Sequence, residues 1–222
     1  MNKNYYCTLD TETVGGASKP KGIYHLGGVI HARDGTVLGC FNYLIAEWLP
    51  LVCNDKYAKK SLPRYEEMKK NGTATLISTE AEAISAVDNL LKLYKVKIIL
   101  CFNTGFDLCK TVCRDLIKDR EFIDVWHLAC ETLGQKKSYY DFCIKNNLLS
   151  ATKKTISTSA ETFYAYLTNN PNYVEEHTAL EDSKIELVVF LACIKQKKKI
   201  TRNLHHYDYE AWRKLHPKVK KV

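Results

Sequence analysis

The opening strand of the chain, and the acids near its end, constrain the fold more than any other feature. Residues Tyr5 to Gly16 read YYCTLDTETVGG, a β-branched and aromatic run that is typical of a buried strand and ends in glycines. Asp10 and Glu12 stand one residue apart, and side chains at i and i+2 of a strand point to the same face. Two carboxylates so close repel each other unless a cation lies between them or one binds a proton. Hard divalent cations such as Mg²⁺ are bound through oxygen ligands of this kind.

This spacing alone is weak evidence, because acid-x-acid pairs are common in the chain. There are four of them: Asp10/Glu12, Glu80/Glu82, Asp119/Glu121 and Asp208/Glu210. Only the first follows an apolar strand and runs into glycines. For any such pair, a charged strand end in solvent is the commoner arrangement. A metal site therefore requires further oxygens and a base from elsewhere in the chain.

Composition narrows the class of protein. A chain of 222 residues with 45% hydrophobic and 26% charged residues suits one globular domain, with or without an appendage. No apolar run approaches the roughly 20 residues that cross a bilayer, and Asn2-Lys3-Asn4 leads into a strand rather than a secretory segment. The nine cysteines are odd in number and form no C-x-x-C pair, which argues against a zinc site or a disulfide framework. We therefore predict a reducing, cytoplasmic setting.

The net charge of +8 lies at the C-terminal end. From Lys195 to Val222 there are ten Lys or Arg residues against two acids, and the rest of the chain holds 23 basic and 23 acidic residues. A basic tail on a neutral body suggests a polyanionic partner, although a solvated end that aids solubility is equally consistent. We predict one domain over residues 1–195 and a basic C-terminal extension over residues 196–222.

Hydrophobic periodicity predicts strands first and then alternating helices and strands. Beyond the opening stretch, the predicted strands are Ile23–His31, Val37–Ile45, Lys97–Phe102 and Phe122–Val125. The predicted helices are Pro63–Lys69, Thr79–Tyr94, Asn103–Leu116, Trp126–Leu133, Ser138–Asn146, Ser159–Leu167 and Thr178–Lys195. The rest of Glu47–Ser78 is predicted as a loop, either a functional lid or plain decoration. This order predicts an α/β fold with a mixed five-stranded sheet flanked by helices.

Asp107 follows a predicted central strand and lies in the first turn of a helix. With Thr104 as the N-cap, Asp107 would be the acid of a capping box, which is a structural role. Functional sites of α/β sheets also collect at the carboxyl ends of strands, where Asp107 emerges. Both interpretations are open at the level of sequence.

The start of the last long helix carries an unusual pair. Thr178 and Glu181 form a predicted capping box, which places His177 and Asp182 at the two positions whose side chains usually form an apolar staple. An imidazole and a carboxylate stabilise little by apolar contact. We therefore predict a functional role for His177 rather than the core or surface role of most single histidines.

Three motifs of the chain resemble, in sequence order, those of the DEDDh branch of the DnaQ-like 3′–5′ exonucleases: Asp10-x-Glu12, Asn103-x-x-Phe106-Asp107 and His177-x-x-x-x-Asp182. Asp124, in the segment IDVWHLA, also matches a family segment. The resemblance spans roughly residues 5 to 193 and does not extend to Glu47–Ser78 or to the basic end. The stretch from Lys145 to Glu186 looks most like exonucleases encoded by bacteriophages.

The resemblance implies an RNase H-like fold and a role for each matching residue. The carboxylates that would hold two Mg²⁺ or Mn²⁺ ions are Asp10, Glu12, Asp107 and Asp182. His177 would be the general base that takes a proton from the attacking water. The terminal nucleotide would contact Thr13, Val14 and Gly15, and the scissile phosphate would lie near Asn103 and Phe106.

We therefore expect a metal-dependent 3′–5′ exonuclease that releases nucleoside 5′-monophosphates from single-stranded ends, with DNA slightly favoured over RNA. Its expected setting is the cytoplasm, that of the host if the protein is phage-encoded. The expected partners are single-stranded 3′ ends and, as in the resembling family, a second copy of the chain, but no membrane. Two alternatives are open: a catalytically silent nucleic-acid-binding module on the same fold, and a structure-specific endonuclease using the same metals.

Overall fold

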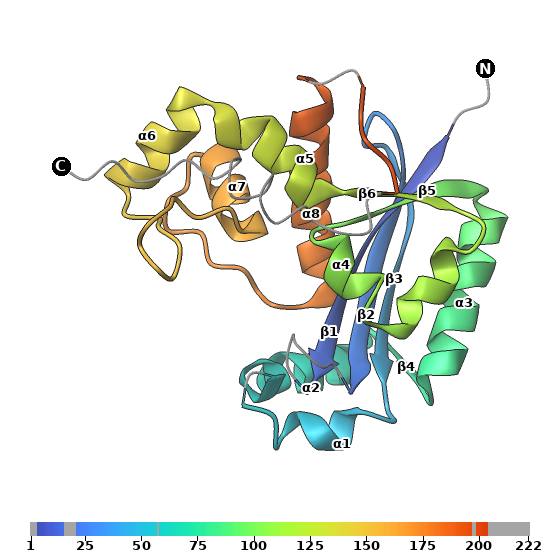
Figure 1. The fold of residues 1–222 in the computed structure, drawn as a ribbon. Helices are drawn as coiled ribbons and strands as arrows, with labels where there is room; N and C mark the ends of the chain where they lie inside the picture. Colours follow the sequence, from blue (N-terminus) through green and yellow to red (C-terminus); the bar gives the residue numbers. More distant parts are fainter. Residues whose placement is uncertain (1–3, 16–20, 57, 197–198, 204–222) are drawn as a thin grey trace.

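The chain folds into a mixed sheet between two layers of helices (Figure 1). The computed structural model describes residues 4–15, 21–56, 58–196 and 199–203. Within them the sheet has six strands in the order β4-β3-β2-β1-β5-β6, so the strand that carries Asp10 and Glu12 is central. The α/β class with a mixed sheet, predicted from the sequence, is confirmed.

The five predicted strands are present. β1 (Tyr5–Val14) pairs antiparallel with β2 (Gly22–Ala32), which pairs antiparallel with β3 (Val37–Ile45). β5 (Val96–Cys101) is parallel to β1, and β6 (Glu121–Asp124) is parallel to β5. The sixth strand, β4 (Thr75–Ile77), pairs in parallel with β3 inside the segment predicted as a loop. Three residues are too few for an alternating pattern to be recognised in the sequence.

Helices flank the sheet on both sides. The α-helices are α1 (Leu49–Val52), α2 (Leu62–Asn71), α3 (Glu80–Leu93), α4 (Thr104–Asp107), α5 (Val125–Glu131), α6 (Lys137–Lys145), α7 (Ala160–Leu167) and α8 (Ala179–Ile194). The 3₁₀ turns are η1 (Ala58–Ser61), η2 (Val112–Ile117) and η3 (Leu133–Gln135). α3 begins as its capping box predicts, because the Thr79 hydroxyl accepts a hydrogen bond from the Glu82 N–H at 3.2 Å.

The predicted helix Asn103–Leu116 is wrong in both its cap and its length. Asn103 is the N-cap, in a left-handed conformation with φ of 78°, and its side chain makes no capping hydrogen bond. Thr104 instead donates from its N–H and its hydroxyl to Oδ2 of Asp124, each at 2.9 Å. The α-helix ends at Asp107, and after residues 108–111 the chain forms the 3₁₀ turn η2. An acid at the end of the neighbouring strand β6 has thus taken the place of a local cap.

Residues of β1 alternate between the two helical layers. Tyr6 packs in the core formed with α5, α7 and α8, whereas Cys7 and Leu9 pack in the core formed with α3 and η2. Figure 1 shows α8 and α3 on opposite sides of the sheet. α8 approaches β2 closely at Gly27, where an added Cβ would lie 2.2 Å from the backbone N of Leu180. Gly27 is paired with Asp10, so the start of α8 lies next to the acidic end of β1.

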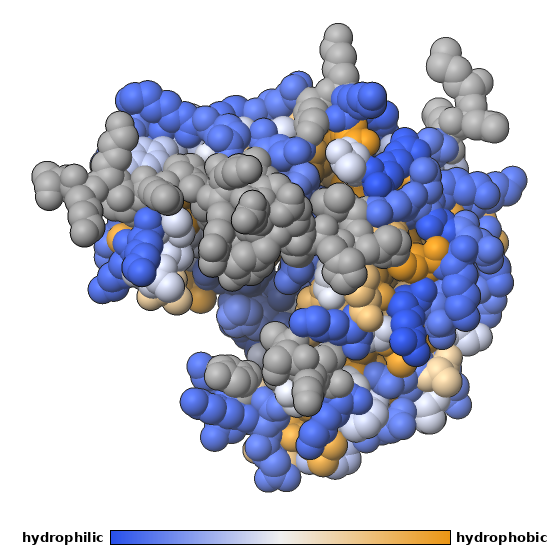
Figure 2. Space-filling model, in the orientation of Figure 1, coloured by the Kyte–Doolittle hydropathy of each residue, from blue (hydrophilic) through white to orange (hydrophobic). Residues whose placement is uncertain are grey.

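The segment Glu47–Ser78 forms packed structure at the end of β1. Val52 and Tyr65, from α1 and α2, share a buried cluster with Val14 of β1. Asp55 accepts a hydrogen bond from the Gly15 N–H at 2.9 Å. Figure 2 shows a largely hydrophilic face that is hollowed between the part with α6 and α7 and the part with α1 and α2.

Part of the predicted basic extension returns to the sheet. The Asn203 N–H donates to the Phe122 carbonyl at 2.8 Å, and the Phe122 N–H donates to Oδ1 of Asn203 at 3.0 Å. Residues 197–198 and 204–222 of the extension lie outside the described residues. None of the helices described is both long and apolar enough to cross a membrane. All nine cysteines are free, and most are buried.

Candidate active site

The end of β1 brings together the four carboxylates that the sequence singled out. Asp10 and Glu12 stand on β1, Asp107 ends the short α4, and Asp182 lies in the first turn of α8. Burial and then the charge of Asp107 raise the pKa of Asp10 well above its usual range. Burial and then the charge of Asp10 do the same to the pKa of Glu12. Three separate elements thus deliver four mutually repelling carboxyl groups to one place.

Asp107 is tied directly to β1. Its Oδ1 accepts hydrogen bonds from the N–H and the hydroxyl of Thr11, at 3.2 and 2.6 Å. Burial nevertheless dominates and raises the pKa of Asp107 to about 7. Thr11 stands between Asp10 and Glu12, so these bonds hold Asp107 beside the other two acids.

The start of α8 is capped from another strand. Thr178 is the N-cap residue, but its buried hydroxyl has no hydrogen-bond partner within the described part of the chain, and Glu181 instead pairs with Lys184. The predicted capping box of Thr178 and Glu181 is therefore wrong. The free N–H of Ala179 donates to Nδ1 of His25 on β2 at 3.2 Å. A buried imidazole has supplied the acceptor that the local sequence was expected to supply.

His25 is suited to that capping role because it is neutral. Its Nε2 lies 2.6 Å from Oδ1 of Asn42, which is an acceptor, so the ring proton sits on Nε2 and Nδ1 is free to accept. Burial lowers the pKa of His25 to about 4. This histidine has a structural function, as expected of most single histidines.

His177 lies at the mouth of the site. Its backbone is left-handed with φ of 54°, and its side chain is 66% exposed. Its Nδ1 lies 3.9 Å from Oε2 of Glu175. One potential ligand atom from each of Glu12, His177 and Asp182 lies within 4.8 Å of the others. The structure thus places the imidazole beside two of the four carboxylates.

Two tyrosines connect α2 with the site. Tyr65 is fully buried, and its hydroxyl lies 3.2 Å from both the Tyr24 hydroxyl and the carbonyl oxygen of His177. Tyr24 donates in turn to Oε2 of Glu12 at 3.4 Å. Burial is the main reason that the pKa values of both tyrosines are raised, so both hydroxyls keep their protons. No local sequence pattern connects residue 65 with residues 12 and 177.

Two further acids, Glu175 and Glu186, were not predicted. Burial and then the charge of Glu161 raise the pKa of Glu175 to about 7. Glu186 is buried on α8, and its pKa is raised well above the usual range by burial and then by Asp10. An available signal for Glu186 was its position four residues after Asp182, on the same helix face. Glu175 lies in an irregular segment, where spacing indicates no direction for a side chain.

The predicted substrate contacts differ in their exposure. Gly15 and Asn103 are exposed, and Thr13 and Phe106 are partly exposed. Val14 is 1% exposed, with its side chain in the cluster beneath α2. The side chain of Val14 therefore does not line the surface, whereas the other four predicted contacts can.

The donor set fits divalent cations. Six carboxylates surround the site: Asp10, Glu12, Asp107, Glu175, Asp182 and Glu186. In the described part of the chain, none of them pairs with a lysine or an arginine. Near a protein surface, two like charges about 4 Å apart repel by roughly 4 kcal/mol. Oδ1 of Asp182 is also buried, and it has no hydrogen-bond partner among the residues that the structure describes. Carboxylate oxygens are the ligands that Mg²⁺ and Mn²⁺ prefer.

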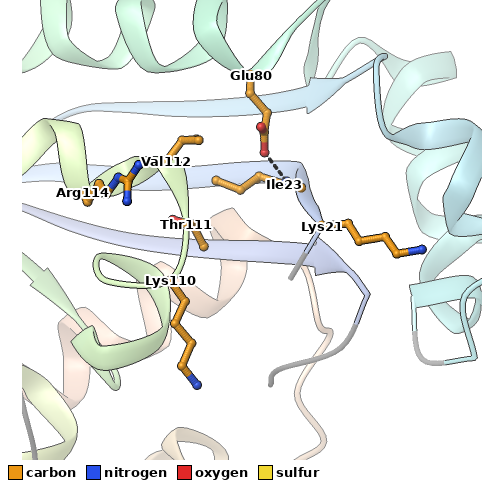
Figure 3. Close-up of a pocket in the computed structure, with 8 residues that line it drawn as sticks. Lys21, Ile23, Glu80, Lys110, Thr111, Val112 and Arg114 are labelled. Carbon is orange, nitrogen blue, oxygen red and sulfur yellow. Dashed lines mark hydrogen bonds between the residues drawn. The ribbon is translucent and has the colours of Figure 1, made fainter. Parts of the chain in front are cut away.

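A pocket lined by basic residues lies near this site, at the start of β2 and η2. Lys21, Lys110 and Arg114 line it, and its volume is about 150 Å³. In Figure 3, Glu80 reaches from α3 to the backbone N–H of Ile23, to which it is hydrogen-bonded, while both lysines extend away from it. Three basic residues and one acid, Glu80, thus border this pocket near the strand end that carries the acids.

Comparison with solved structures shows that the fold is that of known nucleases. Escherichia coli Exonuclease I in complex with a dA16 oligonucleotide superposes with a TM-score of 0.54 and 13% identity, over 88% of this chain and 42% of that chain. Cell-death related nuclease 4 (CRN-4) superposes with a TM-score of 0.54 and 14% identity, over 87% of this chain and 64% of that chain. The chain thus spans less than two thirds of either protein. No protein-family model and no curated protein matches the sequence. At this identity the likeness shows a shared fold alone.

Proposed function

We propose that this chain is a metal-dependent 3′–5′ exonuclease of the DEDDh type, acting on single-stranded nucleic acid and releasing nucleoside 5′-monophosphates. One observation carries the proposal. Carboxylates from β1, α4 and α8 converge at one strand end, and the imidazole of His177 lies within 4.8 Å of ligand atoms of Glu12 and Asp182. The likeness to Exonuclease I, of which one structure holds dA16, supports a nucleic-acid substrate.

The residues of the site would have two roles, holding the cations and keeping the carboxylates in position. The four carboxylates of the family motif would hold the cations: Asp10, Glu12, Asp107 and Asp182. Two divalent cations stabilise the attacking and leaving oxygens of an in-line displacement at phosphorus when they are bound. Thr11 keeps Asp107 in position through its two hydrogen bonds, and Tyr24 makes one hydrogen bond to Glu12. These contacts would keep the acids from moving apart under their own repulsion.

His177 would accept the proton of the attacking water. The carboxylate of Glu175, 3.9 Å from Nδ1, lies on one side of the ring and would help to orient it. The short distances to Glu12 and Asp182 also suit a second role, that of cation ligand. His177→Ala separates the two. A base predicts unchanged Mn²⁺ affinity with most of the rate near pH 7 lost, and a ligand predicts that affinity falls as well.

The substrate backbone would be held by basic residues outside the acidic site. Lys21, Lys110 and Arg114 supply cations for phosphates beside the site, and the basic residues beyond 203 would add more. Each phosphate neutralised makes binding more dependent on salt. We place DNA slightly ahead of RNA as substrate.

The decisive experiment uses 3′-labelled single strands of DNA and RNA, incubated with Mg²⁺ and the full chain. We expect rapid release of labelled mononucleotide by the wild type, none by Glu12→Ala, and wild-type release by Glu66→Ala, which changes an exposed acid on α2. Equal release by wild type and Glu12→Ala would refute the enzyme. Stable binding without release would favour a silent binding module. Cleavage of circular single strands would favour an endonuclease.

A further inference from the structure

Glu186 is a buried acid that the proposed mechanism does not use. It lies in the second turn of α8, four residues after Asp182, and is 3% exposed. Its Oε2 is buried and has no hydrogen-bond partner in the described part of the chain. A buried polar atom without a partner costs free energy, and the cost is larger for a group that can ionise. The otherwise apolar interior next to α8 therefore holds an acid whose presence needs an explanation.

The charged groups that act most strongly on Glu186 are acids. Its pKa is raised by burial and then by the charges of Asp10, Asp107, Asp182 and Glu175. These groups lie on β1, on α4, on α8 itself and in the segment before α8. The neighbouring polar residues on α8 are engaged elsewhere. The Ser183 hydroxyl donates to the carbonyls of Gly27 and Ala179, and Lys184 pairs with Glu181.

A second unpartnered oxygen lies on the same face of the helix. Oδ1 of Asp182 is also buried without a partner among the described residues. Residues four apart in a helix lie one above the other, with Cβ atoms about 6 Å apart. Two unsatisfied carboxylate oxygens thus belong to residues one turn apart on the buried face of α8. One divalent cation between them would satisfy both and reduce the repulsion among the acids.

We propose that Glu186 is a fifth carboxylate of the divalent-cation site and helps Asp10, Asp107 and Asp182 to hold the cation. The inference rests on the proposed function, since it concerns the same metal site. It differs from the four-carboxylate motif in assigning a ligand role to a residue one helical turn deeper in the structure. The competing role is a neutral, protonated carboxyl that only fills space in the core.

Glu186→Gln distinguishes these roles because it keeps the shape and one oxygen acceptor while removing the charge. Glu181→Gln is the matched control, since it removes an exposed acid from the same helix, next to Asp182. Mn²⁺ binding to the full chain, without substrate, is measured by calorimetry and by the electron paramagnetic resonance of free Mn²⁺. The melting temperature is followed in chelator and in Mg²⁺.

A ligand role predicts that Glu186→Gln raises the Kd for Mn²⁺ by about tenfold or more, the scale seen when groups around a metal are removed. The variant should also melt higher than wild type in chelator and gain less from Mg²⁺, while Glu181→Gln binds as wild type does. Wild-type Mn²⁺ affinity in Glu186→Gln would overturn the inference. If that variant does not fold, Glu186→Asp, which retracts the carboxylate, should weaken Mn²⁺ binding, and an unchanged Kd there would overturn the inference equally.

Failure of this inference and failure of the proposed function have different signatures. Weaker Mn²⁺ binding by Glu186→Gln, in a chain that degrades no nucleic acid, would support the fifth carboxylate and refute the exonuclease. Degradation that depends on Glu12, together with wild-type Mn²⁺ binding by Glu186→Gln, would do the reverse.

Discussion

Without divalent cations the protein should lose stability as the pH rises from about 5 to about 8, and Mg²⁺ should restore it. Glu175 is the clearest source of the effect. Its pKa is raised from 4.5 to about 7, first by burial and then by the charge of Glu161. A carboxyl group with a higher pKa in the folded state binds its proton more tightly there. Its contribution is therefore complete below pH 4.5 and is lost as the pH rises through about 7.

The size of the effect follows from the two pKa values of Glu175. They differ by about 2.5, and each pKa unit corresponds to about 1.4 kcal/mol, so the free energy of unfolding should fall by about 3 kcal/mol. The Glu175 side chain is 16% exposed, so solvent screens little of this. In a domain of this size, about 3 kcal/mol lowers the melting temperature by roughly 6 to 12 °C. The raised pKa of Asp107 acts in the same direction.

The assay is thermal unfolding followed by circular dichroism in chelator at several pH values, repeated with Mg²⁺. Glu175→Gln cannot titrate at this position, so its melting temperature should change less with pH than that of the wild type. Glu66→Gln, at an exposed acid paired with Lys69, should follow the wild type. Mg²⁺ binds the ionised carboxylates and should stabilise most at high pH. A wild-type melting temperature that is constant or rises with pH in chelator would refute the reasoning, as would an unaltered pH dependence in Glu175→Gln.

Three further substitutions test the parts around the acids. Tyr65→Phe removes the hydroxyl at 3.2 Å from the His177 carbonyl, and it should lower the free energy of unfolding by about 1 to 3 kcal/mol. It should also lower kcat more than it changes KM. Thermal unfolding and steady-state kinetics measure the two effects, and an unchanged kcat would deny Tyr65 a positioning role. Arg114→Glu should weaken the binding of single strands and reduce the slope of log Kd against log salt concentration by about 1 to 2. The measurement is Kd at several salt concentrations. An unaltered slope would exclude contact between Arg114 and the nucleic-acid backbone. Gly27→Ala would place a Cβ 2.2 Å from the backbone of α8, which should lower the free energy of unfolding by about 1 to 3 kcal/mol and remove most of the nuclease rate. In the control Gly134→Ala the nearest atom is at 3.5 Å, so neither quantity should change. A fully active Gly27→Ala would show that the close approach is dispensable.

The α/β class and the assembly of the four acids were predictable from local patterns. The apolar runs of β1 and β5 are long enough to identify as strands, and the rule that strand ends share one edge of a sheet then places Asp10 and Asp107 together. The 3.6-residue period identified α8, and its start placed Asp182 in the first turn. Each of these inferences depends only on residues close together in the sequence.

The predicted helix caps were wrong because the actual capping contacts join residues far apart in the sequence. Thr104 was expected to cap its own helix, but Asp124 on the next strand takes its N–H and hydroxyl. Thr178 was expected to cap α8, but His25 from β2 accepts the Ala179 N–H. In both cases a local cap was a sound prediction from spacing, and a partner on another strand provided the acceptor. A periodic pattern carries no information about such partners.

The strand that arranges this site, β2, carries none of its carboxylates. The pairing of β1 with β2 shifts register between Glu12 and Thr13. Glu12 is therefore opposite His25 and Thr13 is opposite Ile23, while Tyr24 between them has no opposite residue on β1. Strict alternation would place the side chains of Tyr24 and His25 on opposite faces of β2, but a bulge can turn one of them toward the face of the other. The rings of Tyr24 and His25 accordingly both pack at 5.2 Å against the ring of Tyr65. From these adjacent positions, Tyr24 reaches Glu12 and His25 caps α8. One bulge thus connects an acid of β1 with the helix that carries Asp182, and a period-two pattern could not have revealed it.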